Sequence, residues 1–391
     1  MLSIRADGTS TPTSNSGGRI KVMQVIDGMG IGGAEMVVRD LVHHLDRDRF
    51  DVSICCTKGV GGSIGEALLK EGANLFVLSK TGGRADYFEP FKLRRAALER
   101  GVDIMHSHGT AALFTTGPCR VMTRPVKLVH TLHYGNYPYA ARRRHYMEKM
   151  CVRLVDHLVA VGREQGRQVQ TIYGLPDSRM NVVWNGIKPS TPRPDLSFRS
   201  KVGADDRLLI GTIAKLIEQK GLEDLLMVAR RCKDAGHRMK FVIVGDGPLR
   251  ADLERRRHEL GVEDFVHFTG WIHDAAKSVL PSFDVFFQPS RWEAMAIVIL
   301  EAMSCSKAIV ATKVGDNPHV LQHGVNGLLV DSGDIESMVS ALTQLTNAKI
   351  RSDLGQNALA RFMEKFTIEQ MIQRYENVYS ALMQPDRNAQ A

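Results

Sequence analysis

The sequence predicts an α/β protein with two doubly wound domains, each built on a parallel β-sheet covered by helices. From Arg19 onward, short apolar runs alternate with stretches of helical period, which is the pattern of βαβ units. A segment over 188–194, with three prolines in six residues, interrupts this alternation, which resumes at Leu208. An extended linker between two similarly built halves accounts for these observations.

The first half is predicted to begin with a strand over 20–26, a turn at Gly32 and Gly33, and a helix over 34–45. Further strand candidates lie at 52–56, 74–78, 104–106, 127–131, 157–161 and 181–183. These elements define an N-terminal domain over 19–187. Residues 1–18 are rich in Ser, Thr and Gly, lack the apolar core of a signal peptide, and are expected to form a disordered extension.

The second half repeats this construction. Its strand candidates lie at 208–213, 240–244, 265–268, 285–287, 308–311 and 327–330, and a final helical run covers 367–383. They define a C-terminal domain over 201–365, which the linker at 188–200 connects to the first. Ligands of doubly wound sheets bind beyond the carboxyl ends of the strands, so the site is expected in the cleft between the halves.

The composition narrows the partners and the compartment. A formal charge of +8 and a pI near 9.2 suit an anionic partner, such as nucleic acid, a nucleotide sugar or an anionic membrane. The six cysteines show no paired framework and no Cys-x-x-Cys spacing, and are interpreted as free thiols in a reducing cytoplasm. No stretch approaches the roughly 20 apolar residues of a membrane-spanning helix. No group of His, Cys and carboxylates has metal-ligand spacing.

Two glutamates near the C-terminal end mark the strongest candidate site. Glu293 and Glu301 stand eight positions apart, after a Pro-Ser pair and with small and apolar residues between them. With a helix starting near Ala294, Glu301 would lie about two turns into it and Glu293 at its mouth. Free N–H groups and the positive end of the helix dipole attract an anion such as a diphosphate to that mouth. One carboxylate is expected to bind sugar hydroxyls and the other a ribose.

This segment resembles the Glu-x7-Glu signature of retaining family-4 glycosyltransferases (glycosyl transferases group 1). Further landmarks of that family follow its order, at 31–35, 131–133, 184–187, 214–216, 220–221, 244–248, 269–270 and 323–330. The resemblance implies the GT-B fold, in which two Rossmann-like domains face each other across a cleft. A C-terminal helix, within 366–391 here, would cross back to the first domain. The resemblance also implies a nucleotide-diphosphate sugar as co-substrate, no other cofactor and no metal.

In the first domain, Gly32 and Gly33 would let backbone N–H groups approach a phosphate or sugar, although a tight strand-to-helix turn is the alternative. The resemblance places His133 beside the transferred sugar, where its imidazole would bond a sugar hydroxyl or help position the acceptor. The family's Asp after this histidine is Tyr134 here. One of the neighbouring histidines is expected to be structural: His106, His108 or His130.

In the second domain, Lys215 and Lys220 are expected to neutralise a diphosphate as its charge develops. The family more often has Arg at the first of these positions, and Lys lacks its bidentate fork. The resemblance assigns Glu293 to the donor sugar and Glu301 to the ribose. Donor binding is also expected of two glycines and of the residues after the first glutamate: Gly245, Gly247, Ala294, Met295, Ala296 and Ile297.

Three departures from the family pattern bear on activity. Ala294, Met295 and Ala296 replace a common Gly-Phe-Gly, Asp316 replaces a Gly, and His319 replaces the Glu of a Pro-Glu pair. These changes suggest an unusual donor preference or reduced activity. They also motivate the alternative that the protein has a non-catalytic role.

A basic stretch with interleaved apolar residues suggests contact with an anionic membrane or a phospholipid-linked acceptor. Its cations are Arg142, Arg143, Arg144, Lys149 and Arg153. A helix with one solvated basic face is the equally weighted alternative. Asp246 between two glycines is interpreted as a turn residue, and Asp46 and Asp48 as parts of a solvated loop.

The function expected is that of a cytoplasmic, metal-independent retaining glycosyltransferase, peripheral to the membrane at most. It would transfer a hexose-type sugar from a nucleotide-diphosphate donor to a hydroxyl of a glycan or lipid-linked acceptor, in polysaccharide or glycoconjugate biosynthesis. Nucleic acid is not an expected partner. A non-catalytic binding subunit of the same fold and a nucleotide-sugar epimerase are the alternatives.

Overall fold

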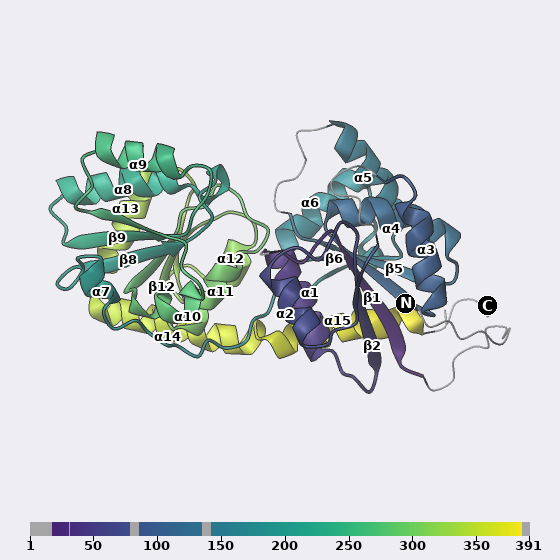
Figure 1. Ribbon diagram of the computed structural model, residues 1–391. Coiled ribbons are helices and arrows are strands. Elements are labelled where there is room, and N and C mark those ends of the chain that lie inside the picture. The colour runs from purple at the N-terminus through teal and green to yellow at the C-terminus, as the bar shows by residue number, and fades with distance from the viewer. Residues whose placement is uncertain (1–17, 31, 79–85, 135–141, 385–391) are drawn as a thin grey trace.

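The computed structural model describes residues 18–30, 32–78, 86–134 and 142–384. Within these ranges the chain forms two sheets of parallel strands. The sheets lie side by side, and each has helices on both faces (Figure 1). The predicted fold class is therefore confirmed. Disorder was expected for residues 1–18, and all of these except Gly18 lie outside the described residues. Ile31, one of the family landmarks, also lies outside them.

The first sheet has the strand order β3-β2-β1-β4-β5-β6-β7, and each neighbouring pair is parallel. Its strands are β1 (Ile20–Ile26), β2 (Phe50–Cys56), β3 (Leu75–Val77), β4 (Ile104–His108), β5 (Lys127–Leu132), β6 (His157–Ala160) and β7 (Met180–Val182). Its helices are α1 (Gly33–His44), α2 (Ser63–Lys70), α3 (Glu89–Glu99), α4 (Thr110–Met122), α5 (Arg142–Leu154), α6 (Arg163–Tyr173) and the 3-10 turn η1 (Asp177–Arg179).

The second sheet has the order β10-β9-β8-β11-β12-β13 and is also parallel. Its strands are β8 (Leu208–Ile213), β9 (Met239–Val244), β10 (Val266–Gly270), β11 (Val285–Gln288), β12 (Ala308–Thr312) and β13 (Leu328–Val330). Its shorter helical elements are α7 (Phe198–Lys201), η2 (Glu218–Lys220), α10 (Ala275–Ser278), η3 (Leu280–Ser282) and α12 (Asn317–Val320). The longer helices are α8 (Leu222–Asp234), α9 (Arg250–Glu259), α11 (Ile297–Ser304), α13 (Ile335–Gln344), α14 (Ala348–Lys365) and α15 (Ile368–Met383).

The strand order reverses next to β1 in the first sheet and next to β8 in the second. Such reversal points open a crevice at the carboxyl ends of the strands, because the connections leave to opposite faces. The loops after β1 and β8 therefore carry the residues with the best access to a ligand. Helix α7 begins inside the expected linker range, so the extended stretch after Ile187 is shorter than predicted.

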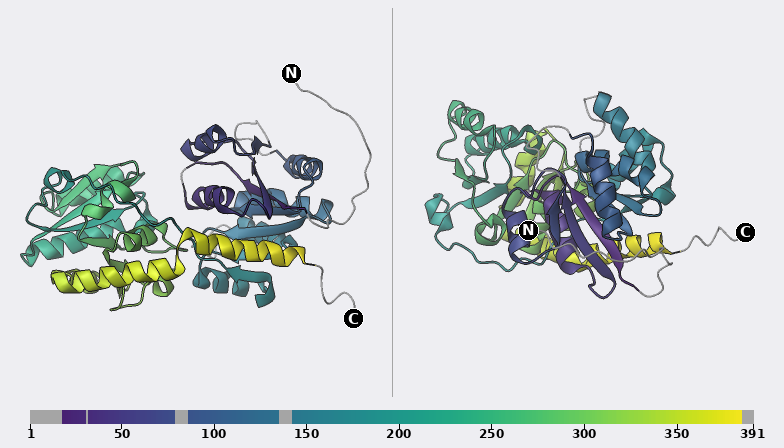
Figure 2. Two further views of the ribbon diagram at one scale, coloured as in Figure 1. Left: turned by 90° about the horizontal axis from the view of Figure 1, so that it is seen from below. Right: turned by 45° about the vertical axis from the view of Figure 1, so that its right-hand side comes forward.

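The chain passes between the domains twice, and the two crossings lie against each other. The Ile187 N–H donates to Phe366 O at 3.1 Å, and the Ile368 N–H donates to Ile187 O at 3.0 Å. A Cβ at Gly186 would stand 2.3 Å from Thr367 O, so this close approach requires glycine. Figures 1 and 2 show α14 under the second sheet and α15 under the first. The expected return of the C-terminal helix is confirmed, because Tyr375 and Tyr379 lie in the core beneath the first sheet.

Candidate active site

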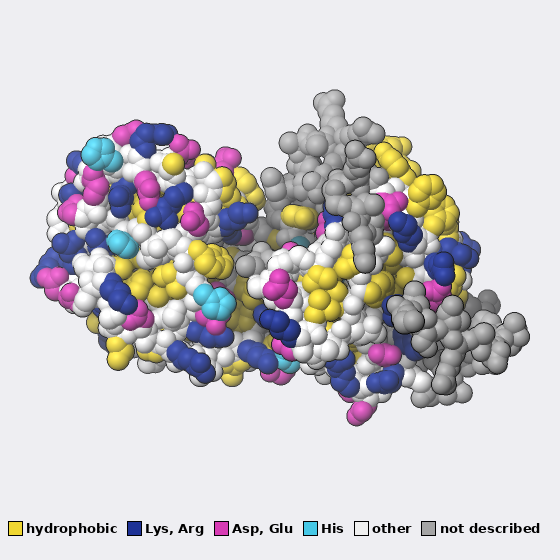
Figure 3. Space-filling view, in the orientation of Figure 1, with side chains coloured by type: hydrophobic (Ala, Val, Ile, Leu, Met, Phe, Trp, Pro, Cys, Tyr) yellow, Lys and Arg dark blue, Asp and Glu magenta, His cyan; other side chains and the backbone are white. Residues whose placement is uncertain are grey.

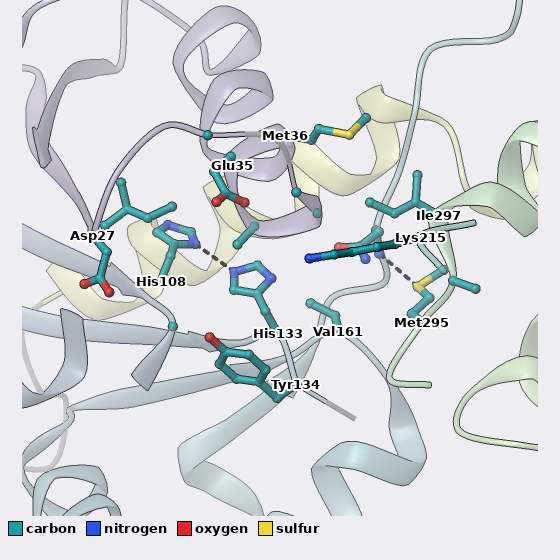
Figure 4. A pocket seen from close by; sticks show the side chains of 18 of the residues that line it. Asp27, Glu35, Met36, His108, His133, Tyr134, Val161, Lys215, Met295 and Ile297 are labelled. Carbon is teal, nitrogen blue, oxygen red and sulfur yellow. Dashed lines mark hydrogen bonds between the residues drawn. The ribbon is translucent and has the colours of Figure 1, made fainter. Parts of the chain in front are cut away.

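A pocket of about 910 Å³ lies between the two sheets, lined by the loops that follow β1, β4 and β5 in one domain and β8 and β11 in the other (Figure 4). This volume is in the range of sites for small organic ligands. Most residues expected from the sequence contribute to it: Gly32, Gly33, His133, Lys215, Lys220, Glu293, Met295, Ala296, Ile297 and Glu301.

The N-terminal domain forms one side of the pocket, the first wall, and the C-terminal domain forms the opposite side, the second wall. The first wall begins with the glycine-rich loop after β1. A Cβ on Gly32 would stand 2.5 Å from Glu35 Oε2, and a Cβ on Gly33 would stand 3.4 Å from Ile297 Cδ1. Gly33 and Ile297 belong to opposite domains, so the two walls meet here. The small residues keep this edge of the pocket open to a ligand.

His133 and His108 together form the floor of the pocket on the side of the first wall. His108 ends β4, and its Nδ1 lies 3.0 Å from His133 Nε2 (Figure 4). Burial lowers the pKa of His133 to about 4, and it holds the pKa of His108 well below the ordinary value. Both imidazoles are therefore neutral at pH 7, and each ring has one donor and one acceptor nitrogen.

Two of the competing histidines are structural. The His106 ring lies between the hydroxyls of Tyr379 and Thr131, at 2.6 and 2.7 Å. His130 Nδ1 lies 2.9 Å from Ser107 Oγ. Both are buried, and neither lines the pocket. His108, by contrast, shares the pocket with His133.

Lys220 and Glu293 on the second wall contact each other directly. Lys220 Nζ lies 2.5 Å from Glu293 Oε1, and both side chains are largely buried. Other groups converge on the same carboxylate: Ser290 Oγ at 2.8 Å, Gln219 Nε2 at 3.1 Å and Gln288 Nε2 at 3.2 Å. The sequence predicted separate roles for Lys220 at the diphosphate and Glu293 at the donor sugar, whereas in the structure the carboxylate also positions the ammonium group.

Lys215 follows β8 and its side chain extends across the pocket toward His133 (Figure 4). Gly245 and Gly247 lie behind the backbone of this loop and do not line the pocket. A Cβ at Gly245, whose φ is +137°, would stand 1.9 Å from Ala214 O, and one at Gly247 would stand 2.6 Å from Leu216 O. These two glycines therefore support the loop that carries Lys215, and their expected contact with the donor stays a prediction. The Gly247 N–H donates to Asp246 Oδ1 at 2.7 Å, as expected of a turn.

Helix α11 begins three residues later than predicted, at Ile297, because the segment before it is bonded elsewhere. Ala294 O accepts the Asp316 N–H at 3.0 Å, and Ala296 has an extended backbone with ψ at 106°. Ala294 is buried and does not line the pocket, and its expected contact with the donor stays a prediction. Glu301 stands little more than one turn into the helix, at the pocket wall. Burial, with a smaller contribution from Asp274, raises the pKa of Glu301 to about 7.

Asp316 joins the two domains. It is fully buried, and it accepts the Trp184 Nε1–H at 2.7 Å and the Glu164 N–H at 2.9 Å. Glu164 is the second residue of α6, so the carboxylate of one domain caps a helix of the other, where the helix dipole favours an anion. The departure from the family pattern at this position therefore lies in the domain interface, outside the pocket lining.

Several residues that line the pocket were not among the predicted site residues. Asp27 and Lys58 stand at the carboxyl edge of β1 and β2, and their side chains are 3.2 Å apart. Asn185 lies on the wall with a buried Oδ1 that has no hydrogen-bond partner within the described structure. Asp27 and Lys58 could have been predicted as pocket residues from the sequence, because each follows a predicted strand. Glu35 and Tyr134 also line the pocket.

No group of three or more His, Cys, Asp or Glu side chains in the described ranges is arranged to hold a metal ion. No helix among the described residues is long and apolar enough to cross a membrane. The six cysteine thiols are free.

A cleft between two doubly wound domains, with paired lysines and glutamates on one wall, defines a GT-B glycosyltransferase. The family model "Glycosyl transferases group 1" matches residues 195–361, and "Glycosyltransferase Family 4" matches residues 31–191. The chain therefore belongs to the family-4 glycosyltransferases.

Individual relatives and structures agree with this assignment. An uncharacterised glycosyltransferase of Methanocaldococcus jannaschii is 28% identical over 297 residues, which are 72% of this chain and 76% of that protein. An Escherichia coli UDP-Gal:alpha-D-GlcNAc-diphosphoundecaprenol alpha-1,3-galactosyltransferase is 21% identical over 375 residues, 89% of this chain and 94% of its own length. The crystal structure of HepE from Anabaena in complex with UDP superposes with a TM-score of 0.79 at 22% identity, covering 93% of this chain and 100% of HepE.

Proposed function

We propose that this glycosyltransferase moves a hexose-type sugar from a nucleoside diphosphate to a hydroxyl group of a glycan or lipid-linked acceptor, with retention of configuration and without a metal ion. The observation that carries the proposal is one pocket in which Lys215, Lys220 and Glu301 face the neutral His133 across the domain boundary. Cations suit a departing diphosphate, and a neutral imidazole suits sugar hydroxyls.

The donor would lie along the second wall. The first two residues of α11, Ile297 and Val298, line the pocket, and the N–H groups at the start of a helix are available to bind an anion. A diphosphate bound there would be within reach of Lys215 and Lys220. Glu301, further along the same helix, would accept hydrogen bonds from the ribose.

Lys220 and Glu293 would act as a unit during bond cleavage. The ammonium group is held by Glu293, so no reorganisation is needed when negative charge develops on the diphosphate. Glu293 would in turn contact the donor sugar, as the family resemblance implies.

The transfer would proceed on one face of the sugar. The acceptor oxygen bonds to the anomeric carbon as the bond from that carbon to the diphosphate oxygen breaks, and the acceptor proton passes to the departing diphosphate. The engagement of Glu293 by Lys220 and by three further donor groups supports this route over a covalent intermediate on that carboxylate.

The acceptor would approach from the side of the first domain. The Escherichia coli relative is named for a diphosphoundecaprenol-linked acceptor. The structure adds apolar side chains on the outer face of the first domain, where hydrophobic atoms gather over α3 (Figure 3). Phe88, Phe91, Tyr146 and Met150 are 56–68% exposed on α3, its N-cap and α5. Lys149 and Arg153, further along α5, are described cations near these residues, and the side chains of Arg142, Arg143 and Arg144 lie outside the described residues.

We therefore propose peripheral contact of this face with an anionic membrane on the cytoplasmic side, because exposed apolar groups beside cations favour such a surface. Sedimentation with vesicles of pure phosphatidylcholine, and of phosphatidylcholine mixed with phosphatidylglycerol, tests it. Binding to the mixed vesicles that is lost in a Phe88→Ser and Phe91→Ser double variant supports the proposal. No sedimentation with either vesicle contradicts it.

The transfer itself is tested with a panel of UDP-, GDP- and ADP-sugars. A cognate donor at 100 times its dissociation constant should stabilise the protein by roughly 2.7 kcal/mol. Turnover is then measured with glycan and lipid-linked acceptors, in EDTA, and the anomeric configuration of the product is read by NMR. The expected product keeps the donor configuration and forms in EDTA at the same rate.

Each alternative predicts a different outcome. An inverted product contradicts retention, and loss of turnover in EDTA with recovery in Mg²⁺ contradicts the metal-free route. Conversion of one nucleotide sugar into another without acceptor indicates an epimerase. Turnover no higher than that of a Glu293→Gln and Glu301→Gln double variant indicates a non-catalytic subunit.

A further inference from the structure

A continuous series of side-chain hydrogen bonds runs from the pocket through the first sheet to the C-terminal helix. His133 Nε2 lies 3.0 Å from His108 Nδ1, and His108 Nε2 lies 2.8 Å from Gln24 Oε1. Gln24 Nε2 donates to Tyr379 Oη at 3.2 Å. The series continues through Tyr379, His106, Thr131 and Tyr375, with distances of 2.6, 2.7 and 3.3 Å.

Gln24 gives this series a direction. Its amide oxygen can only accept, so the group facing it, His108 Nε2, must be protonated. A neutral His108 then has a lone pair on Nδ1, and it accepts the proton of His133 Nε2. The remaining nitrogen of His133, Nδ1, is left without a proton, and Figure 4 shows this side of the ring turned to the open pocket.

We propose that Gln24 and His108 are positioning residues that fix the tautomer of His133, so that its Nδ1 presents a lone pair to the ligand. Gln24 is fully buried in β1 and lies outside the pocket lining, and it therefore acts only through His108. Its opposite end is held by Tyr379 on α15. The returning C-terminal helix thus takes part in setting the chemistry of the pocket.

The consequence concerns what His133 recognises, and this step rests on the proposed function. A lone pair accepts a hydrogen bond from a hydroxyl, and it repels a phosphate oxygen or a carbonyl oxygen. The His133 side of the pocket is therefore assigned to a sugar or acceptor hydroxyl and the lysine side to the diphosphate. With the Gln24 amide turned over, every bond in the series would reverse and His133 would offer an N–H instead.

The tautomer is measured without any substrate. Protein labelled with ¹⁵N-histidine gives long-range ¹H–¹⁵N spectra in which protonated and unprotonated ring nitrogens differ, and the His133→Gln variant identifies the His133 signals. We expect Nδ1 to be unprotonated at pH 7.5. A protonated Nδ1 in the parent protein overturns the proposal.

Two variants complete the test. Gln24→Met keeps the volume of the side chain and removes the amide, so the His133 nitrogens should show a mixture of tautomers. Ser107→Ala is the matched control, because Ser107 is equally buried on β4 but bonds His130 outside the series. An unchanged His133 tautomer in Gln24→Met contradicts the proposal.

Kinetics separates this inference from the proposed function. With a turning-over donor, Gln24→Met should lower kcat/KM roughly 3- to 10-fold, the effect of one neutral hydrogen bond, and Ser107→Ala should not. If no donor is turned over, the proposed function fails, but the NMR spectra still test the tautomer of His133. If turnover is found and both variants match the parent, the role assigned to Gln24 is wrong.

Discussion

The two walls of the pocket are built alike and charged differently. Both lie at the carboxyl edge of a parallel sheet, next to the strand where the strand order reverses. At the floor of the first wall, His108 and His133 are neutral rings held by each other. The second wall carries Lys215, and the ion pair of Lys220 with Glu293.

This difference fits the division of roles in the proposed transfer. A leaving group that gains charge needs fixed cations in a partly dehydrated place, since electrostatic stabilisation is strongest there. A neutral imidazole can bind hydroxyl groups without the cost of desolvating a charge. The first wall also has a cation, Lys58, but it is 60% exposed. Substitutions at four positions test this difference between the walls.

Removal of the Lys220 ammonium should have the largest effect. On the proposed function, Lys220→Ala takes away a cation that would face the departing diphosphate, and a loss of about 3 kcal/mol in transition-state stabilisation lowers kcat roughly 100-fold. Steady-state kinetics at saturating donor measures it. A parent-like kcat would show that the second wall does not carry the developing charge.

The pairing with Glu293 supplies the control for that variant. Lys220→Ala leaves a buried carboxylate without its cation, which lowers stability, whereas Lys220→Ala with Glu293→Gln removes both charges. The double variant should regain thermal stability but not kcat. Recovery of kcat together with stability would mean that the single variant had only been unfolding.

Glu301→Gln should raise the donor KM about 10-fold at pH 8, because the proposed bond from the ribose to this carboxylate would form in both ground and transition states. With a pKa of about 7, the parent carboxyl takes up a proton below that pH, so the KM of the parent should rise toward that of the variant at pH 6. A donor KM that is identical for both proteins at pH 8 contradicts the ribose assignment.

The same pKa fixes the sign of a stability effect. The pKa of Glu301 is raised above its unfolded value of 4.5, so between pH 4.5 and 7 the unfolded chain releases its proton first. The free energy of unfolding without donor therefore decreases as pH rises through this range. Glu301→Gln removes that loss and should melt higher than the parent at pH 8 and the same at pH 4.5.

Asp316→Ala tests the contact between the domains. It leaves the Trp184 Nε1–H and the Glu164 N–H without an acceptor, and an unsatisfied buried donor costs about 1–3 kcal/mol. The melting temperature should fall, while Asp353→Ala on the exposed face of α14 serves as the control. If Asp316→Ala melts like the parent, the carboxylate does not join the domains in solution.

Lys58→Ala should have the smallest effect. Lys58 lines the first wall, but its side chain is 60% exposed and its partner Asp27 is 40% exposed, and exposed pairs contribute under about 1 kcal/mol. We expect less than about a threefold change in kcat/KM, measured beside Lys220→Ala. A loss as large as that of Lys220→Ala would abolish the distinction between the walls.

Much of the fold could be read from local pattern. Apolar runs placed β1 and β8 at their observed bounds, and the other strand candidates overlap observed strands. Such runs are informative because strands of a parallel sheet are buried on both faces. The candidate site followed from the same logic, since His133, Lys215 and Lys220 come after strands whose carboxyl ends meet in one crevice.

What the pattern could not supply is contact between residues far apart in the chain. The pairing of Lys220 with Glu293, the capping of α6 by Asp316, and the bond from Gln24 to Tyr379 join positions 73, 152 and 355 residues apart. The late start of α11 has the same origin, since Ala294 O is taken by the Asp316 N–H instead of the helix.

The alternation of strands and helices, the two-domain fold and the chemical types of side chain at the cleft follow from the sequence, because they depend on hydrophobic period and on position after a strand. Which charges pair, which histidines are structural and which wall carries the two neutral imidazoles depend on the tertiary structure. Burial and distance set these properties, and both arise only when segments remote in sequence pack together.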